Sequence, residues 1–168
     1  MTTPKRPLRT QLRDESPALL GLGAAFVLLW TRGRAFVPMD LPAGFDWERY
    51  HREAWKYLHG NADSDTWLEP LYLWLMGSLG DLVGYGTAGL MISSVAMVLL
   101  VCGAALIARA MAGPWAAGVT ALAIPMTAPL AESSRWVNLY PLLGAATALT
   151  LGGAAAYARW PRWRWAVL

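Results

Sequence analysis

Long apolar stretches dominate the second half of the chain. Three of them lack Asp, Glu, Lys and Arg altogether, and they cover residues 82–108, 110–131 and 136–158. At about 1.5 Å per residue, each can cross a hydrocarbon core of roughly 30 Å as a helix. A shorter apolar stretch near the N-terminus predicts one further span. We therefore expect an all-α integral membrane protein with about four transmembrane helices, at 17–36, 87–108, 114–130 and 139–157.

The segment between the first two spans, 37–86, has a different pattern. Apolar residues recur there at the spacing of one helix face: Trp47, Tyr50, Ala54, Tyr57 and Leu58. The opposite face is charged: Glu48, Arg49, Arg52, Glu53 and Lys56. Asp46 is a suitable N-cap and Gly60 a suitable stop. Such an amphipathic helix is typical of a membrane interface, and a second short interfacial helix is expected at 66–83.

The charged residues follow this topology. Arginine and lysine cluster before the first span, at Arg109 between the second and third spans, and after the last span. By the positive-inside rule, the N-terminus is cytoplasmic and the loop 37–86 lies on the outer face of the cell membrane. Residues 1–16 are then an irregular basic cytoplasmic tail. Residues 159–168 form a second cytoplasmic tail or the start of a further, truncated span.

Composition supports the membrane class and excludes others. The chain is 15% charged, whereas soluble proteins are about 25% charged. A basic net charge can indicate nucleic-acid binding, but the bases lie at the ends of spans, so no nucleic-acid partner is expected. Cys102 is the single cysteine, which excludes an intrachain disulfide. A cleaved signal peptide is the alternative interpretation of the first apolar stretch, although no small-residue cleavage site follows it.

The amphipathic segment carries a spaced motif. Its residues fit the pattern Asp-x-x-x-Tyr-x-x-x-Ala-x-x-x-Leu-x-Gly, and they are Asp46, Tyr50, Ala54, Leu58 and Gly60. Pro70-Leu71-Tyr72 follows after a polar turn. In order and spacing, residues 17–168 resemble the GT-C superfamily of membrane glycosyltransferases, which includes protein O-mannosyltransferases and lipid A aminoarabinose transferases. The resemblance implies transfer of a sugar from a polyprenyl-phosphate donor.

The resemblance also implies roles for individual residues. Asp46 occupies the position of the family's catalytic base or metal-associated carboxylate, with Glu48 beside it, so a divalent metal ion at Asp46 is one expectation. The implied substrate-binding residues are Arg49, Tyr50, Glu132, Arg135 and Asn138. Arg49 or Arg135 would meet the donor phosphate, because guanidinium groups bind phosphate strongly. Asn138 stands where the family often has a second acid, which leaves that acidic role to Glu132. Without the resemblance, Asp46 would be interpreted as a helix cap alone.

Two functional interpretations remain open. GT-C enzymes have more than four spans, so the first expects the N-terminal part of a glycosyltransferase that is incomplete alone. Its partners would be a polyprenyl-phosphate sugar, membrane lipid, and the remainder of the enzyme or a partner chain. The second interpretation is a non-enzymatic four-span scaffold or partner subunit that docks through its outer amphipathic loop.

Overall fold

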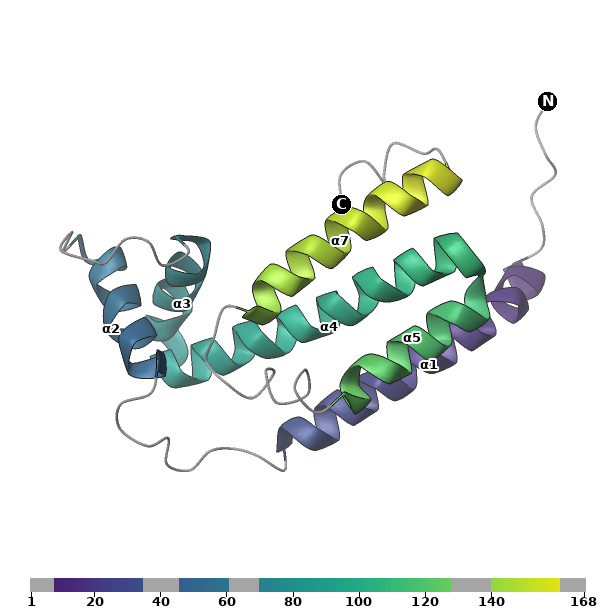
Figure 1. Cartoon of the computed structure of the whole chain (residues 1–168). Helices are drawn as coiled ribbons and strands as arrows, with labels where there is room; N and C mark the ends of the chain where they lie inside the picture. Colours follow the sequence, from purple (N-terminus) through teal and green to yellow (C-terminus); the bar gives the residue numbers. More distant parts are fainter. Residues whose placement is uncertain (1–7, 35–45, 61–69, 128–139, 161–168) are drawn as a thin grey trace.

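The computed structural model describes residues 8–34, 46–60, 70–127 and 140–160, and its regular structure there is entirely helical (Figure 1). The helices are α1 (Leu8–Arg34), α2 (Asp46–Leu58), α3 (Pro70–Val83), α4 (Tyr85–Ala112), α5 (Pro114–Met126) and α7 (Tyr140–Arg159). The all-α prediction is confirmed for these residues. The two short helices expected between the first two spans are present as α2 and α3.

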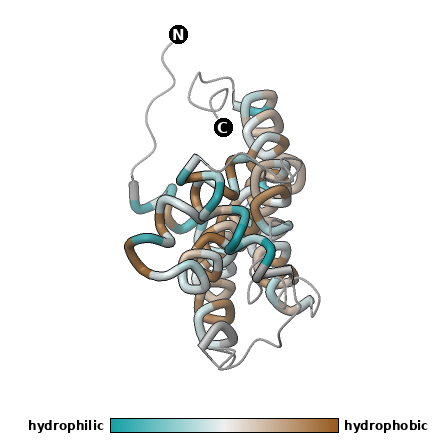
Figure 2. Tube along the Cα trace, turned by 90° about the vertical axis from the view of Figure 1, so that its left-hand side faces the viewer, coloured by the Kyte–Doolittle hydropathy of each residue, from teal (hydrophilic) through white to brown (hydrophobic). Residues whose placement is uncertain are grey.

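The long helix α4 organises the molecule. The helix α7 lies along one side of α4, and α5 and α1 lie along the other side (Figure 1). The short helices α2 and α3 gather at the N-terminal end of α4. Figure 2 looks at this end and shows hydrophilic segments in front of long helices that are mainly hydrophobic. We call α2, α3 and the first turn of α4 the α2–α3 unit.

Small residues allow the long helices to approach one another closely. A Cβ atom added to Gly103 of α4 would lie 2.6 Å from the Ala148 carbonyl carbon of α7, and one added to Gly152 would lie 2.9 Å from the Gly103 carbonyl oxygen. Gly21 of α1 and Gly118 of α5 meet in the same way, backbone against backbone. Seams of this kind are common between helices in membranes, where packing replaces the hydrophobic effect as the force for association.

The first helix is longer than expected. We expected an irregular tail up to residue 16, but α1 begins at Leu8 and contains Pro17 in its interior. Within this helix, Glu15 forms a two-point ion pair with Arg109 near the end of α4. The Arg109 guanidinium also lies 5.2 Å from the centre of the Trp160 ring. One arginine therefore ties the ends of α1, α4 and α7 together.

Two of the described helices, α4 and α7, are long and apolar enough to cross a membrane, judged by length and composition. They cover the spans expected at 87–108 and 139–157. The helix α5 is apolar but has 13 residues, so it measures about 20 Å. Part of the span expected at 114–130 lies outside the described residues.

Candidate functional site

The helix α2 docks on α3 through a face built from one large and one small residue. Tyr50 and Ala54 are buried, and the α3 residue opposite Ala54 is Gly77. A Cβ atom at Gly77 would lie 3.0 Å from the Ala54 carbonyl oxygen, so this close approach depends on glycine. Gly60 ends α2 with φ of 75°, a conformation that glycine adopts without strain. The predicted stop at Gly60 is confirmed.

Two tyrosines form the centre of the α2–α3 unit. The Tyr50 and Tyr72 rings meet edge to face, with centroids 5.3 Å apart. Tyr72 is completely buried, and burial raises the pKa of its phenol well above the usual range, although Ser93 of α4 opposes that shift. No hydrogen bond of normal geometry from the described residues satisfies the Tyr72 hydroxyl. The apolar interior of the unit therefore contains a buried polar group, the Tyr72 hydroxyl.

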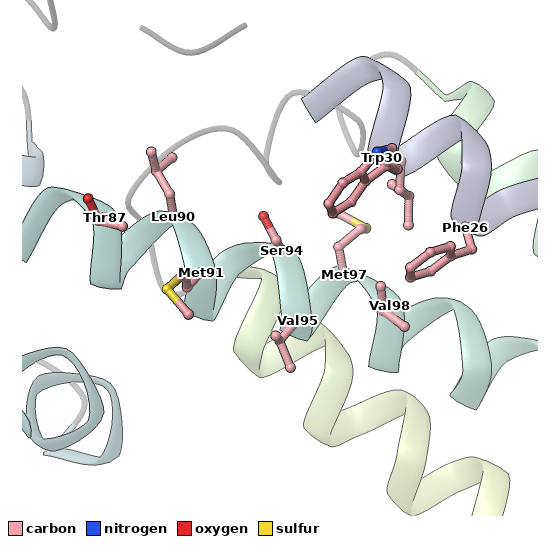
Figure 3. Close-up of a pocket in the computed structure, with 10 residues that line it drawn as sticks. Phe26, Trp30, Thr87, Leu90, Met91, Ser94, Val95, Met97 and Val98 are labelled. Carbon is pink, nitrogen blue, oxygen red and sulfur yellow. The ribbon is translucent and has the colours of Figure 1, made fainter. Parts of the chain in front are cut away.

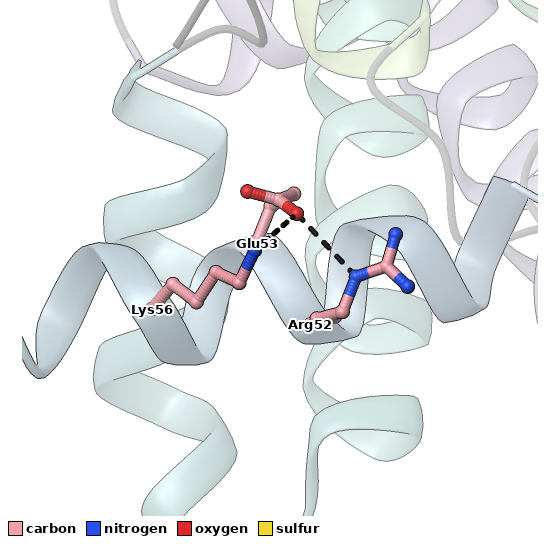
Figure 4. A network of polar contacts seen from close by, with 3 residues as sticks. All are labelled: Arg52, Glu53 and Lys56. Atoms are coloured by element: carbon pink, nitrogen blue, oxygen red, sulfur yellow. Dashed lines mark hydrogen bonds and ion pairs between the residues drawn. The ribbon is translucent and has the colours of Figure 1, made fainter. Parts of the chain in front are cut away.

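Glu53 is the buried acid of the unit. It is 3% exposed, and its Oε1 atom accepts from Lys56 Nζ at 3.3 Å and from Arg52 Nε at 3.5 Å (Figure 4). Its Oε2 atom is buried and has no hydrogen-bond partner among the described residues. We expected Glu53 on the charged face of α2, opposite the apolar face, and this prediction is wrong because Glu53 is buried with Tyr50 and Ala54. The buried face of α2 includes Glu53 because α2 packs on α3 and α4 from that side.

A second polar cluster lies at the surface of the unit, around Asp81 at the end of α3. The Tyr85 hydroxyl donates to Asp81 Oδ1 at 2.9 Å, and His59 Nε2 lies 3.9 Å from Asp81 Oδ2. The His51 ring stacks on Tyr85 with centroids 4.5 Å apart. We call these four residues the Asp81 cluster. In this cluster His59 lies beside the Asp81 carboxylate, and His51 lies against the Tyr85 ring.

The residues proposed from the sequence fall into two groups. Asp46 and Glu48 belong to the first turn of α2, but their side chains lie outside the described part of the structure. Arg49 is partly buried and Tyr50 is buried on the same helix. The remaining candidates also lie outside the described residues: Glu132, Arg135 and Asn138. Their grouping into one site therefore stays a prediction, as does a metal ion at Asp46.

The described residues contain no group of three or more His, Cys, Asp or Glu side chains that could hold a metal ion. Glu53, Asp81 and the histidines were not among our site candidates. One feature of the sequence indicates that Glu53 is buried: it lies three residues after Tyr50, which places both side chains on one helix face. No sequence signal places Asp81 beside His59, because that contact depends on how α2 crosses α3.

An apolar cavity lies between α1 and α4, away from these acids. Its volume is about 440 Å³, and Figure 3 shows Phe26 and Trp30 of α1 facing Met97 and Val98 of α4. A smaller cavity of about 270 Å³ shares Phe26 and Val98 and continues the groove as far as Cys102. The groove offers hydrophobic contact and little polar chemistry.

Comparison of the chain with protein-family models, with curated proteins and with solved structures found no match. Chemical interpretation therefore rests on the residues themselves. The α2–α3 unit offers carboxylates for proton transfer, cations for an anionic group, and exposed aromatic rings. The long helices offer apolar surface.

Proposed function

We propose that this chain is a multi-pass membrane protein and forms the N-terminal part of a glycosyltransferase that uses a polyprenyl-phosphate-linked sugar. In this proposal the four spans are formed by α1, α4, α5 and α7. The N-terminus is cytoplasmic, and the α2–α3 unit lies at the outer face. Asp46 or Glu48 takes the proton of the acceptor hydroxyl, and neighbouring cations bind the donor phosphate.

The observation that carries the proposal is the arrangement of charge on α2. A buried carboxylate, Glu53, lies between Arg52 and Lys56, and its second oxygen is without a hydrogen-bond partner among the described residues. Transfer from a lipid-linked sugar phosphate needs a carboxylate to accept a proton and cations to stabilise the phosphate leaving group. Both kinds of group occur on this one helix, and Arg52 is well exposed.

The location of α2 is the second support. The α2–α3 unit is at one end of the two helices that are long enough to cross a membrane, α4 and α7. Trp55 and Trp74 are 43% and 51% exposed on this unit. Tryptophan is enriched at the level of the lipid headgroups, because one part of its ring system is apolar and its N–H group is polar. A polyprenyl-phosphate donor places its own phosphate at that level.

The test uses the gene at its natural locus and membranes from the same cells. Asp46→Asn removes the proposed base without changing side-chain size, and Asp14→Asn on α1 is the matched control. With a sugar-labelled polyprenyl-phosphate donor, we expect Asp46→Asn to lower transfer by about 100-fold or more, since a general base contributes about 10²–10⁴-fold. The control keeps its transfer. Equal transfer by both variants, at equal protein levels, would remove Asp46 from the reaction.

A further inference from the structure

The contact between the end of α2 and the α3–α4 junction has the geometry of a proton-dependent latch. His59 lies in the turn that follows α2, Asp81 near the end of α3, and Tyr85 at the start of α4. The Tyr85 hydroxyl occupies one oxygen of Asp81, and His59 Nε2 faces the other at 3.9 Å. Three segments are therefore linked through one carboxylate.

The second nitrogen of His59 decides which protonation state fits. His59 Nδ1 lies 2.9 Å from the Trp55 carbonyl oxygen, and a carbonyl oxygen can only accept, so Nδ1 carries a hydrogen. In a neutral ring, Nε2 would then be a bare acceptor that faces a carboxylate. In the imidazolium form both nitrogens donate, one to Trp55 and one toward Asp81.

The aromatic neighbour of His59 favours the same state. The His59 ring stacks on the Trp55 ring, with centroids 4.7 Å apart and planes inclined by 19°. A cation over an indole face is attracted by the ring's electron density, so a charged imidazole gains more from this contact than a neutral one. Two independent contacts thus become stronger when His59 takes up a proton.

The other charged groups near this contact have partners of their own. On α2, Lys56 and Arg52 are paired with Glu53, and the His51 ring stacks on Tyr85. From α3 the group that faces His59 is Asp81, and from α4 it is Tyr85, which is bonded to Asp81. Within the described residues, the change of charge at His59 is therefore felt chiefly by Asp81.

We propose that protonation of His59 latches α2 onto the α3–α4 junction, so that the docking of α2 is tighter in mildly acidic conditions. Imidazole ordinarily changes its charge between pH 5 and 8. The stabilisation is present when His59 is charged and is lost as the pH rises. Since Asp46 and Glu48 begin the same helix, the latch sets how firmly that helix is held, and it does not rest on the proposed sugar transfer.

The test is hydrogen exchange of α2 amides in the intact chain in lipid nanodiscs, at pH 5.5 and 7.5, after correction for the intrinsic pH dependence of exchange. His59 and Asp81 are 41% and 46% exposed, so the effect is that of a surface pair. We expect α2 to open roughly 1.5- to 5-fold more often at pH 7.5 than at pH 5.5. Exchange in the middle of α4 should show no such change, and it also reports that each variant is folded.

Three variants identify the groups. His59→Gln and Asp81→Asn should each abolish the pH dependence of α2 opening, whereas His51→Gln, which removes the other imidazole, should retain it. The proposal is overturned if the wild-type protein shows no pH dependence. It is equally overturned if the dependence survives in His59→Gln, or if His51→Gln is the variant that loses it.

Discussion

The seam between α4 and α7 predicts an unusual penalty for the smallest of substitutions, Gly103→Ala. The added Cβ atom would lie 2.6 Å from the Ala148 carbonyl carbon and 2.8 Å from the Leu149 nitrogen. Carbon atoms are in favourable contact at about 3.5–4.0 Å, so the two helices must separate by roughly 1 Å. Neither neighbour is a flexible side chain that could turn away. Overpacking of this kind costs about 1–3 kcal/mol.

Gly86→Ala supplies the matched control. Gly86 lies in the same helix, and a Cβ atom there would meet nothing within 4 Å. Both variants gain up to about 1 kcal/mol of helix propensity, because alanine loses less backbone entropy than glycine. The clash at Gly103 opposes this gain. We therefore expect Gly103→Ala to be about 1–3 kcal/mol less stable than Gly86→Ala, although the chemical change is identical.

The assay is reversible unfolding by SDS in a mild detergent, followed by tryptophan fluorescence and by a pair of fluorophores that reports the α4–α7 distance. The unfolding free energies of wild type, Gly103→Ala and Gly86→Ala are compared under one condition. The reasoning fails if the two variants are equally stable, because the backbones of α4 and α7 would then be too far apart for one methyl group to matter.

Two further predictions concern single carboxylates. The hydrogen bond from Arg109 holds the pKa of Glu15 below its usual value. The partly exposed pair stabilises the fold by about 0.5–1 kcal/mol. This stabilisation is present at neutral pH and is lost as the pH falls through the lowered pKa. Unfolding titrations of wild type and Glu15→Gln between pH 7 and 3 should therefore converge at low pH, while a constant gap would contradict the pair. Glu53→Leu replaces a buried carboxylate by an apolar side chain of similar size, so it should be neutral or stabilising by about 1 kcal/mol. Glu53→Ala leaves a cavity and should be destabilising. A large loss of stability in Glu53→Leu, measured by the same unfolding assay, would show that Oε2 has a strong partner.

Local signals in the sequence predicted the helices of the α2–α3 unit well. The helix α2 begins at Asp46 and is followed by Gly60, close to the bounds that the sequence indicated, and its aromatic spacing gave the correct period. The capping role of Asp46 stays a prediction. How far the buried side of α2 extends could not be obtained in this way. Glu53 lies three residues after Tyr50, so the helical period places both on one face, but how much of that face is covered depends on where α3 and α4 lie.

Contacts between distant segments are the other part that the sequence leaves open. Glu15 and Arg109 are separated by 94 residues, and neither has a local pattern that indicates the other. In the same way, the Asp81 cluster depends on the turn at Gly84, which has φ of 86° and joins α3 to α4. The roles expected of Asp46, Glu132 and Arg135 stay predictions.

The pairing of α1 with α5 has a consequence for synthesis of the protein. Gly118 packs against the Pro17 carbonyl group, so the main partner of the first helix is made roughly one hundred residues later. At about 5–20 residues per second, a ribosome takes on the order of 5–20 seconds to produce that partner. Throughout this interval the glycine surface of α1 lacks the helix that covers it in the folded chain. The order in which helices emerge is therefore different from the order in which they can pair, and α1 must wait for α5 before its seam can close.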